Sequence, residues 1–146
     1  MNNYNTILVA VDLTAEAEQV MARAAAVAGQ NGTSNLHVVH VIEPLSFAYG
    51  GDIPIDFSAI QDEIQKQAES HLRTLCEKYG VAAEHQHLVT GSPEKEIQAL
   101  AEELGTDLVV LGSHGRHGFG LLLMGSTANG ILHGAKMDVL AVRVGT

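Results

Sequence analysis

Residues 6–12 read Thr-Ile-Leu-Val-Ala-Val-Asp, a short aliphatic run that ends on a carboxylate. A continuous apolar run of this length, without alternating polar residues, is typical of a strand that is buried on both faces. Such strands occur in parallel sheets that are covered by helices on either side. We therefore predict that residues 6–11 form a central strand of such a sheet and that Asp12 follows at its carboxyl end.

The rest of the chain alternates between helix and strand patterns. Further strands are predicted at 36–42, 85–89, 107–111 and 139–144, and helices at about 17–28, 58–79, 93–104 and 126–133. The segment 43–56 contains two Pro and two Gly and is predicted to be a loop. Strict alternation predicts a single α/β domain over residues 1–146, with an open five-stranded parallel sheet and helices on both faces. We expect the common strand order 3-2-1-4-5.

Composition limits the classes of function. The chain has 146 residues, of which 46% are hydrophobic, which is enough for one domain with a real core. No apolar run is long enough to cross a bilayer, Met1–Asn5 lacks the pattern of a signal peptide, and a lone Cys76 allows no internal disulfide. We therefore expect a cytoplasmic protein. The formal net charge of −9 argues against a broad surface for nucleic acid or membrane, although a few local donors can still bind a small anion.

A glycine-rich stretch joins the fourth predicted strand to the last predicted helix. It reads Gly112-Ser-His-Gly115-Arg-His-Gly118-Phe-Gly120-Leu-Leu-Leu-Met-Gly125-Ser126-Thr127. Glycine lets backbone amides approach a ligand closely, and the free N–H groups at a helix start favour phosphate. The expected strand order places the ligand crevice between strands one and four, beside Asp12 and Gly112. We therefore predict a phosphate-binding loop here, with a plain turn as the alternative. No Lys follows the last glycine, so it is not a Walker-type loop.

Together these residues resemble the universal stress protein family. The resemblance rests on the first strand ending at Asp12, on Gly91-Ser92-Pro93, and on the spacing Gly, two residues, Gly, nine residues, Gly-Ser in the glycine-rich stretch. It covers nearly the whole chain, and that spacing marks the family's ATP-binding branch. It implies a Rossmann-like fold of the adenine nucleotide alpha hydrolase-like type that binds ATP, AMP or ADP, with or without Mg²⁺, across strands one, two and four.

The resemblance also implies roles for single residues. Asp12 would contact the ribose or the metal-phosphate region, although it could instead cap the first helix. The adenine would be bordered by Ala10, Val11 and Val41, and the ribose and phosphates would be held by Gly112, Gly115, Gly125, Ser126 and Thr127. We add Leu111, which ends the fourth strand, and Arg116, which is the dependable cation of the loop because His114 and His117 are mostly neutral at pH 7. One departure is Met137-Asp138, where the family usually has a small residue and Pro, and this resembles the branch that does not bind nucleotide.

The remaining histidines and the cysteine carry no predicted function. His85 and His87 share a face of a predicted strand, but no Cys or carboxylate stands at ligand spacing, so no metal site is predicted. His37 and His40 are predicted to point to opposite faces of their strand, with nothing paired. Cys76 is predicted to be a small core residue without an activating cation.

Three functions remain open on this evidence. The first is a nucleotide-binding stress or signalling protein, with slow ATP hydrolysis at most because no general base is identified. The second is a stress protein that acts through dimerisation and protein partners without nucleotide. The third is a genuine nucleotide hydrolase. Strand Val139-Leu-Ala-Val-Arg-Val144 would leave an exposed aliphatic sheet edge, so we predict that it pairs with its copy across a two-fold axis, as the resemblance also implies.

Overall fold

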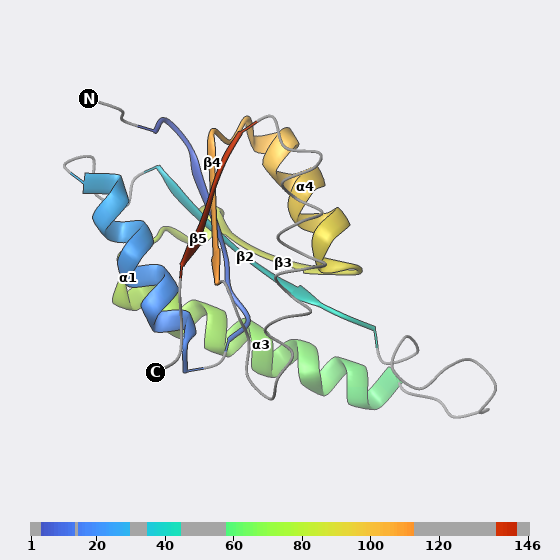
Figure 1. Ribbon diagram of the computed structural model, residues 1–146. Coiled ribbons are helices and arrows are strands. Elements are labelled where there is room, and N and C mark those ends of the chain that lie inside the picture. The colour runs from blue at the N-terminus through green and yellow to red at the C-terminus, as the bar shows by residue number, and fades with distance from the viewer. Residues whose placement is uncertain (1–3, 14, 30–34, 45–57, 113–136, 143–146) are drawn as a thin grey trace.

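The computed structural model describes residues 4–13, 15–29, 35–44, 58–112 and 137–142, and Figure 1 labels its elements. Within these ranges five strands form one sheet in the order β3-β2-β1-β4-β5, and every neighbouring pair is parallel. The strands are β1 (Ile7–Ala10), β2 (Leu36–Ile42), β3 (Gln86–Thr90), β4 (Leu108–Gly112) and β5 (Asp138–Val142). The predicted fold class and strand order are therefore confirmed.

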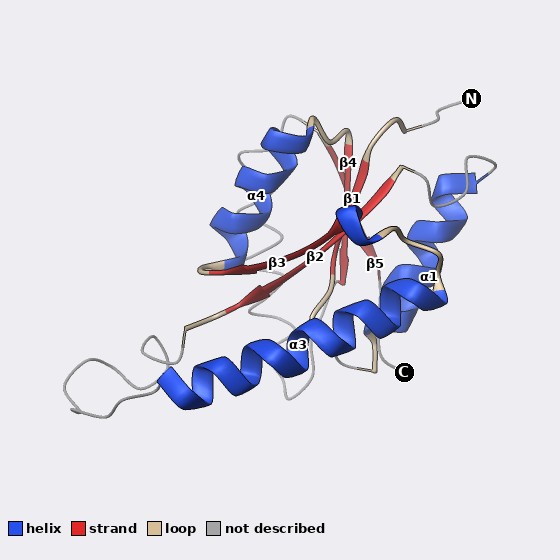
Figure 2. Cartoon of the chain, turned by 180° about the vertical axis from the view of Figure 1, so that it is seen from behind, coloured by secondary structure: helices blue, strands red, loops and turns tan. Residues whose placement is uncertain are grey.

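Helices cover both faces of the sheet (Figures 1 and 2). Two of them, α1 (Ala17–Ala28) and α3 (Ser58–Lys78), lie on one face, and α4 (Pro93–Leu104) lies on the other. A short 3-10 turn, η2 (Ala83–His85), leads into β3. The predicted helix at 126–133, most of the predicted loop at 43–56 and residues 143–144 of the last predicted strand lie outside the described residues.

The core consists of two apolar layers on either side of the central strands. Alternate residues of β1 point to opposite faces, so Ile7 and Val9 pack with α1 and α3, whereas Leu8 packs with α4. All three side chains are fully buried. Cys76 belongs to the first layer, and its burial raises the pKa of the thiol to about 11. The thiol is therefore protonated at neutral pH, and the prediction of an inert core residue is confirmed.

Glycine and proline set the helix ends as the sequence predicts. Gly29 follows α1 with φ = 62°, and its N–H donates to the carbonyl of Ala25. The left-handed backbone at this position favours glycine because it has no Cβ. Ser92 precedes α4 and Pro93 is its first residue, but the Ser92 side chain makes no capping hydrogen bond. The order of Ser92 and then Pro93 predicts a side-chain cap followed by the first helical residue, so α4 starts where predicted but lacks that cap.

One prediction about α3 is wrong. The helical spacing of apolar residues in 58–79 predicts Ile60 on the inner stripe of this helix, but it is 53% exposed, whereas Ala68, Leu72 and Leu75 further along are buried. The reason is length: 21 helical residues span about 31 Å, whereas a strand of five residues spans about 17 Å. The amino-terminal turns of α3 therefore reach beyond the strands (Figure 2).

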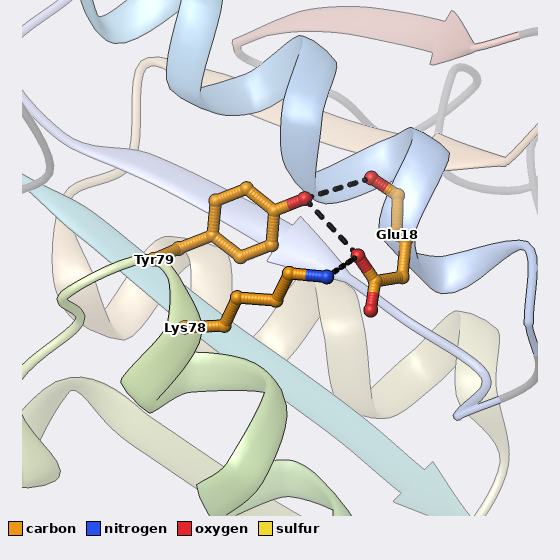
Figure 3. Close-up of polar contacts among 3 residues, drawn as sticks. All are labelled: Glu18, Lys78 and Tyr79. Atoms are coloured by element: carbon orange, nitrogen blue, oxygen red, sulfur yellow. Dashed lines mark hydrogen bonds and ion pairs between the residues drawn. The ribbon is translucent and has the colours of Figure 1, made fainter.

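Polar contacts join α1 to the end of α3 (Figure 3). Lys78 Nζ lies 2.6 Å from Glu18 Oε1, and the Tyr79 hydroxyl donates to the Glu18 backbone carbonyl at 3.3 Å. The hydrogen bond with Glu18 raises the pKa of Lys78, so this side chain stays charged. Because both charges face solvent, we expect the pair to orient the helix ends more than to stabilise the fold.

The amino-terminal edge of the sheet is held by two carboxylates. Asp107 accepts hydrogen bonds from the backbone N–H groups of Asn5 at 2.8 Å and Thr6 at 2.9 Å. Asp138 accepts from the Tyr4 hydroxyl at 2.7 Å. The chain before β1 is thereby tied to the starts of β4 and β5, at the edge opposite the predicted ligand crevice.

Gly91 provides a test of this fold. It has φ = 153°, its N–H donates to the carbonyl of Ile42 at 2.9 Å, and a Cβ at this position would lie 2.6 Å from Glu96 Oε2. We expect Gly91→Ala to lower the free energy of unfolding by about 1–3 kcal/mol, measured by urea denaturation, because both the backbone and the contact are strained.

Two variants separate these causes. Gly105→Ala also has a left-handed backbone, but nothing lies within 4 Å of the added Cβ, so its cost should be the smaller of the two. Glu96→Ala in the Gly91→Ala background should recover the part of the loss that comes from the contact. Equal stability of Gly91→Ala and the native protein would contradict the strained geometry.

Candidate functional site

The predicted site residues that the structure describes gather at the carboxyl edge of the sheet. Because all strands are parallel, their carboxyl ends meet at one edge, and the winding direction reverses between β1 and β4. Ala10 ends β1, Val41 lies near the end of β2, and Leu111 lies near the end of β4. All three belong to the apolar layer on the α4 face. They form a continuous apolar wall at the point where the order of the strands reverses.

Val11 and Asp12 follow β1 at this edge but differ from Ala10. The N–H of Val11 donates to the carbonyl of Val39 at 3.0 Å, and its side chain is buried in the layer on the α1 and α3 face. The structure therefore does not bring the Val11 side chain to the wall formed by Ala10, Val41 and Leu111. The Asp12 side chain is exposed at the end of β1, where a ligand can reach it.

The backbone after Asp12 turns through an unusual conformation. Leu13 has φ = 60°, in the left-handed region that branched residues rarely adopt. Such strain costs on the order of 1–3 kcal/mol and persists only where the surroundings hold it. It often occurs at functional sites, and here it fixes the direction of the chain directly after the carboxylate. No local sequence signal indicates this conformation, since neither Gly nor Asn stands at position 13.

His40 supports the same turn from the neighbouring strand. Its Nδ1 lies 2.8 Å from the backbone carbonyl oxygen of Val11. Because a carbonyl only accepts, Nδ1 carries the proton and donates. The ring therefore links β2 to the residue just before Asp12. No role was predicted for His40, although a polar residue near the carboxyl end of a buried strand is a usable signal.

Most of the predicted phosphate-binding loop lies outside the described residues, and only Gly112 at its start is described. Gly112 is the last residue of β4, is partly buried and pairs with Val142 of β5. The predicted loop residues beyond it lie outside the described residues: Gly115, Arg116, Gly125, Ser126 and Thr127.

A second polar cluster lies at the amino ends of β2 and β3, and it was not predicted from the sequence. The sequence predicted nothing paired for His37, but its Nδ1 lies 3.0 Å from His87 Nε2. Its ring also stacks on that of His85, with centroids 4.0 Å apart. That prediction is wrong because β2 and β3 are neighbours in a register that sets Val39 opposite His87. Separation along the chain gives no indication of this pairing.

Among the residues that the structure describes, no group of three or more His, Cys, Asp or Glu side chains is arranged to hold a metal ion. None of the helices in the same ranges has both the length and the apolar character of a membrane span.

Comparison with known proteins agrees with this architecture. The model of the universal stress protein family matches residues 3–143. The chain belongs to the universal stress protein family. Its sequence is 45% identical over 142 residues to universal stress protein A homolog 1 of Coxiella burnetii, and the match covers 96% of each chain.

Solved structures of universal stress proteins share the fold. UspA from Lactobacillus plantarum matches with a TM-score of 0.75 at 23% identity, over 98% of this chain and 100% of that one. A universal stress protein in complex with cAMP matches with a TM-score of 0.66 at 20% identity, over 97% of this chain and 98% of that one. At these identities the likeness supports the fold alone.

The His40 contact leads to a prediction about the Asp12 turn. We expect His40→Phe to lower the free energy of unfolding by about 1 kcal/mol, because the ring no longer donates to the Val11 carbonyl. Urea denaturation measures the loss.

His71→Phe is the matched control, since His71 lies exposed on α3, outside the Asp12 turn. Equal effects of the two substitutions would show that the bond to Val11 contributes nothing specific.

Proposed function

We propose that this universal stress protein binds an adenine nucleotide at the carboxyl edge of the sheet and acts in stress response or signalling. One observation carries the proposal: Ala10, Val41 and Leu111 form an apolar wall where the winding reverses between β1 and β4. Ligands of open α/β sheets bind in this crevice. An apolar wall suits the face of a base, and the exposed Asp12 carboxylate suits ribose hydroxyls or a metal-bound phosphate.

The ligand is proposed to be ATP, AMP or ADP, with or without Mg²⁺. The phosphates would be held by the loop after Gly112, through the amides and side chains at Gly115, Arg116, Gly125, Ser126 and Thr127. Support comes from the spacing of the glycines and from the matching fold of a universal stress protein in complex with cAMP. We propose hydrolysis that is slow at most, in a single domain over residues 1–146 of a cytoplasmic protein.

The departure from the family pattern at Asp138 has a local structural account. Its N–H donates to the Asp107 carbonyl at 3.1 Å, which a proline could not do, and its carboxylate accepts from Tyr4. Both contacts lie at the amino-terminal edge of the sheet. The departure therefore lies at the opposite edge from the proposed site and removes none of its residues.

Isothermal titration of ATP with Mg²⁺ into nucleotide-stripped protein tests the proposal. We expect a dissociation constant on the order of micromolar, which corresponds to about −8 kcal/mol. A Gly115→Val variant should bind at least roughly tenfold more weakly, because a branched side chain blocks the approach of backbone amides to phosphate. AMP, ADP and cAMP titrated in the same way rank the nucleotides.

Gly105→Ala is the control for this series, since it changes a glycine at the end of α4 where nothing lies within 4 Å of the added Cβ. It should retain full affinity. Circular dichroism shows whether each variant is folded. Absence of binding by the native protein to every one of these nucleotides would overturn the proposal and favour a protein that acts through partners alone.

We also propose a homodimer through β5. Among the described residues this strand pairs with β4 alone, and its Ala141 side chain is exposed. The N–H of Asp138 points to β4, so alternation along the strand turns the N–H groups of Val139 and Ala141 toward the edge away from β4. An edge of this kind is open to pairing with a second copy of the strand.

Sedimentation velocity at micromolar concentration measures this assembly. We expect a dimer for the native protein and a shift toward monomer for Ala141→Lys, because the two-fold axis would bring two added charges close together. Ala99→Lys, at an exposed alanine of α4, should remain dimeric. A monomeric native protein would overturn the proposed dimer.

A further inference from the structure

His37, His85 and His87 form a compact cluster on the α4 face of the sheet. His37 belongs to β2, His85 ends η2, and His87 lies in β3. The His37 ring stacks on both partners, with centroid distances of 4.0 Å to His85 and 5.3 Å to His87. All three residues are partly buried. The cluster therefore joins the edge strand β3 and the turn before it to β2.

The hydrogen bonds of the cluster depend on its protonation. The 3.0 Å contact between His37 Nδ1 and His87 Nε2 needs one N–H donor and one bare nitrogen. When both rings are protonated, two N–H groups face each other and the bond is lost. His85 Nδ1 lies 2.9 Å from the Leu36 carbonyl, to which it donates. His85 is thereby held against β2 as well.

The surroundings disfavour added charge on the cluster. Burial, then the neighbouring His85 and His87, lower the pKa of His37 to about 4. Burial is also the main cause of a lowered pKa at His87, which the Glu103 carboxylate of α4 partly offsets. The adjacent strand β1 is entirely apolar, and α1 and α3 pack against the other face of the sheet. Glu103 of α4 is the carboxylate that acts on His87.

We propose that this three-histidine cluster is an acid-sensitive contact that holds the edge strand β3 on β2 at neutral pH and releases it as the pH falls. β3 is suited to such a response because, within the described part of the chain, it pairs with β2 alone and each of its residues is at least partly exposed. The inference concerns the amino end of β3 and does not depend on nucleotide binding.

The direction of the effect follows from proton linkage. A histidine of an opened strand takes up a proton near its ordinary pKa of about 6.5, whereas His37 in the closed cluster does so only near 4. Between these values the open form binds more protons, so acidification favours opening. The loss begins as the pH falls below about 6.5 and continues toward 4. Most exposed carboxylates are still ionised in the upper part of this window.

Native-state hydrogen exchange measures the opening of β3 directly. Expressed as protection factors, which remove the intrinsic pH dependence of exchange, the β3 amides should lose roughly tenfold protection between pH 7 and pH 5. The amides of β1 and β4 should retain theirs in the same sample. The experiment uses the full chain in buffer with a chelator, so that no metal ion bridges the rings.

His37→Asn tests the cluster, because asparagine fills part of the space without titrating. We expect its β3 protection to vary by less than about twofold over this range, and the matched variant His71→Asn on exposed α3 to behave as the native protein. Equal loss in His37→Asn, or simultaneous loss throughout the sheet, would overturn the proposal.

A second measurement does not depend on a variant that folds. Proton NMR of the native protein follows the imidazole resonances with pH. A titration midpoint for His37 below about 5 supports the proposal, and one at or above its ordinary value of about 6.5 overturns it.

Discussion

Parallel pairing of β1 with both β2 and β4 is the constraint on which the rest of this structure depends. A parallel pair cannot be closed by a tight turn, so each strand must be followed by a crossover that covers a face of the sheet. Both faces of β1 are therefore buried, which is why Ile7, Leu8 and Val9 are all apolar and fully inaccessible. The same pairing makes the chain wind in opposite directions from β1, and it places the carboxyl ends of β1 and β4 side by side.

The two edges of the sheet have different chemistry as a result. At the carboxyl edge, an apolar wall of Ala10, Val41 and Leu111 lies beside an exposed Asp12, and the backbone is held in an unusual turn by His40. At the amino-terminal edge, Asp107 and Asp138 satisfy backbone and hydroxyl donors, and three histidines join β3 to β2. The first arrangement combines an apolar wall with an exposed carboxylate, whereas the second ties neighbouring elements together through its polar groups.

Histidine illustrates how position decides the role of a residue type. His40 donates to a backbone carbonyl and positions a turn, whereas His37 shares a hydrogen bond with another ring and responds to its protonation. The two side chains are three residues apart on one strand and point to opposite faces, as predicted. Their partners come from different elements, β1 for one and β3 with η2 for the other. Neither partner is near in sequence, so no local pattern distinguishes the two roles.

The sequence by itself determined the elements of this fold and their order. Aliphatic runs marked the strands, and Gly29 and Pro93 marked helix ends, because these signals depend on local backbone geometry and on burial of both strand faces. Asp12 and Gly112 could be placed at one edge because the carboxyl ends of parallel strands meet at the same edge of the sheet. Only the tertiary structure decided which residues meet across strands: the register of β2 on β3 brought His37 to His87, and the length of α3 left Ile60 exposed. Register and overhang depend on how whole elements pack, and no short stretch of sequence contains that information.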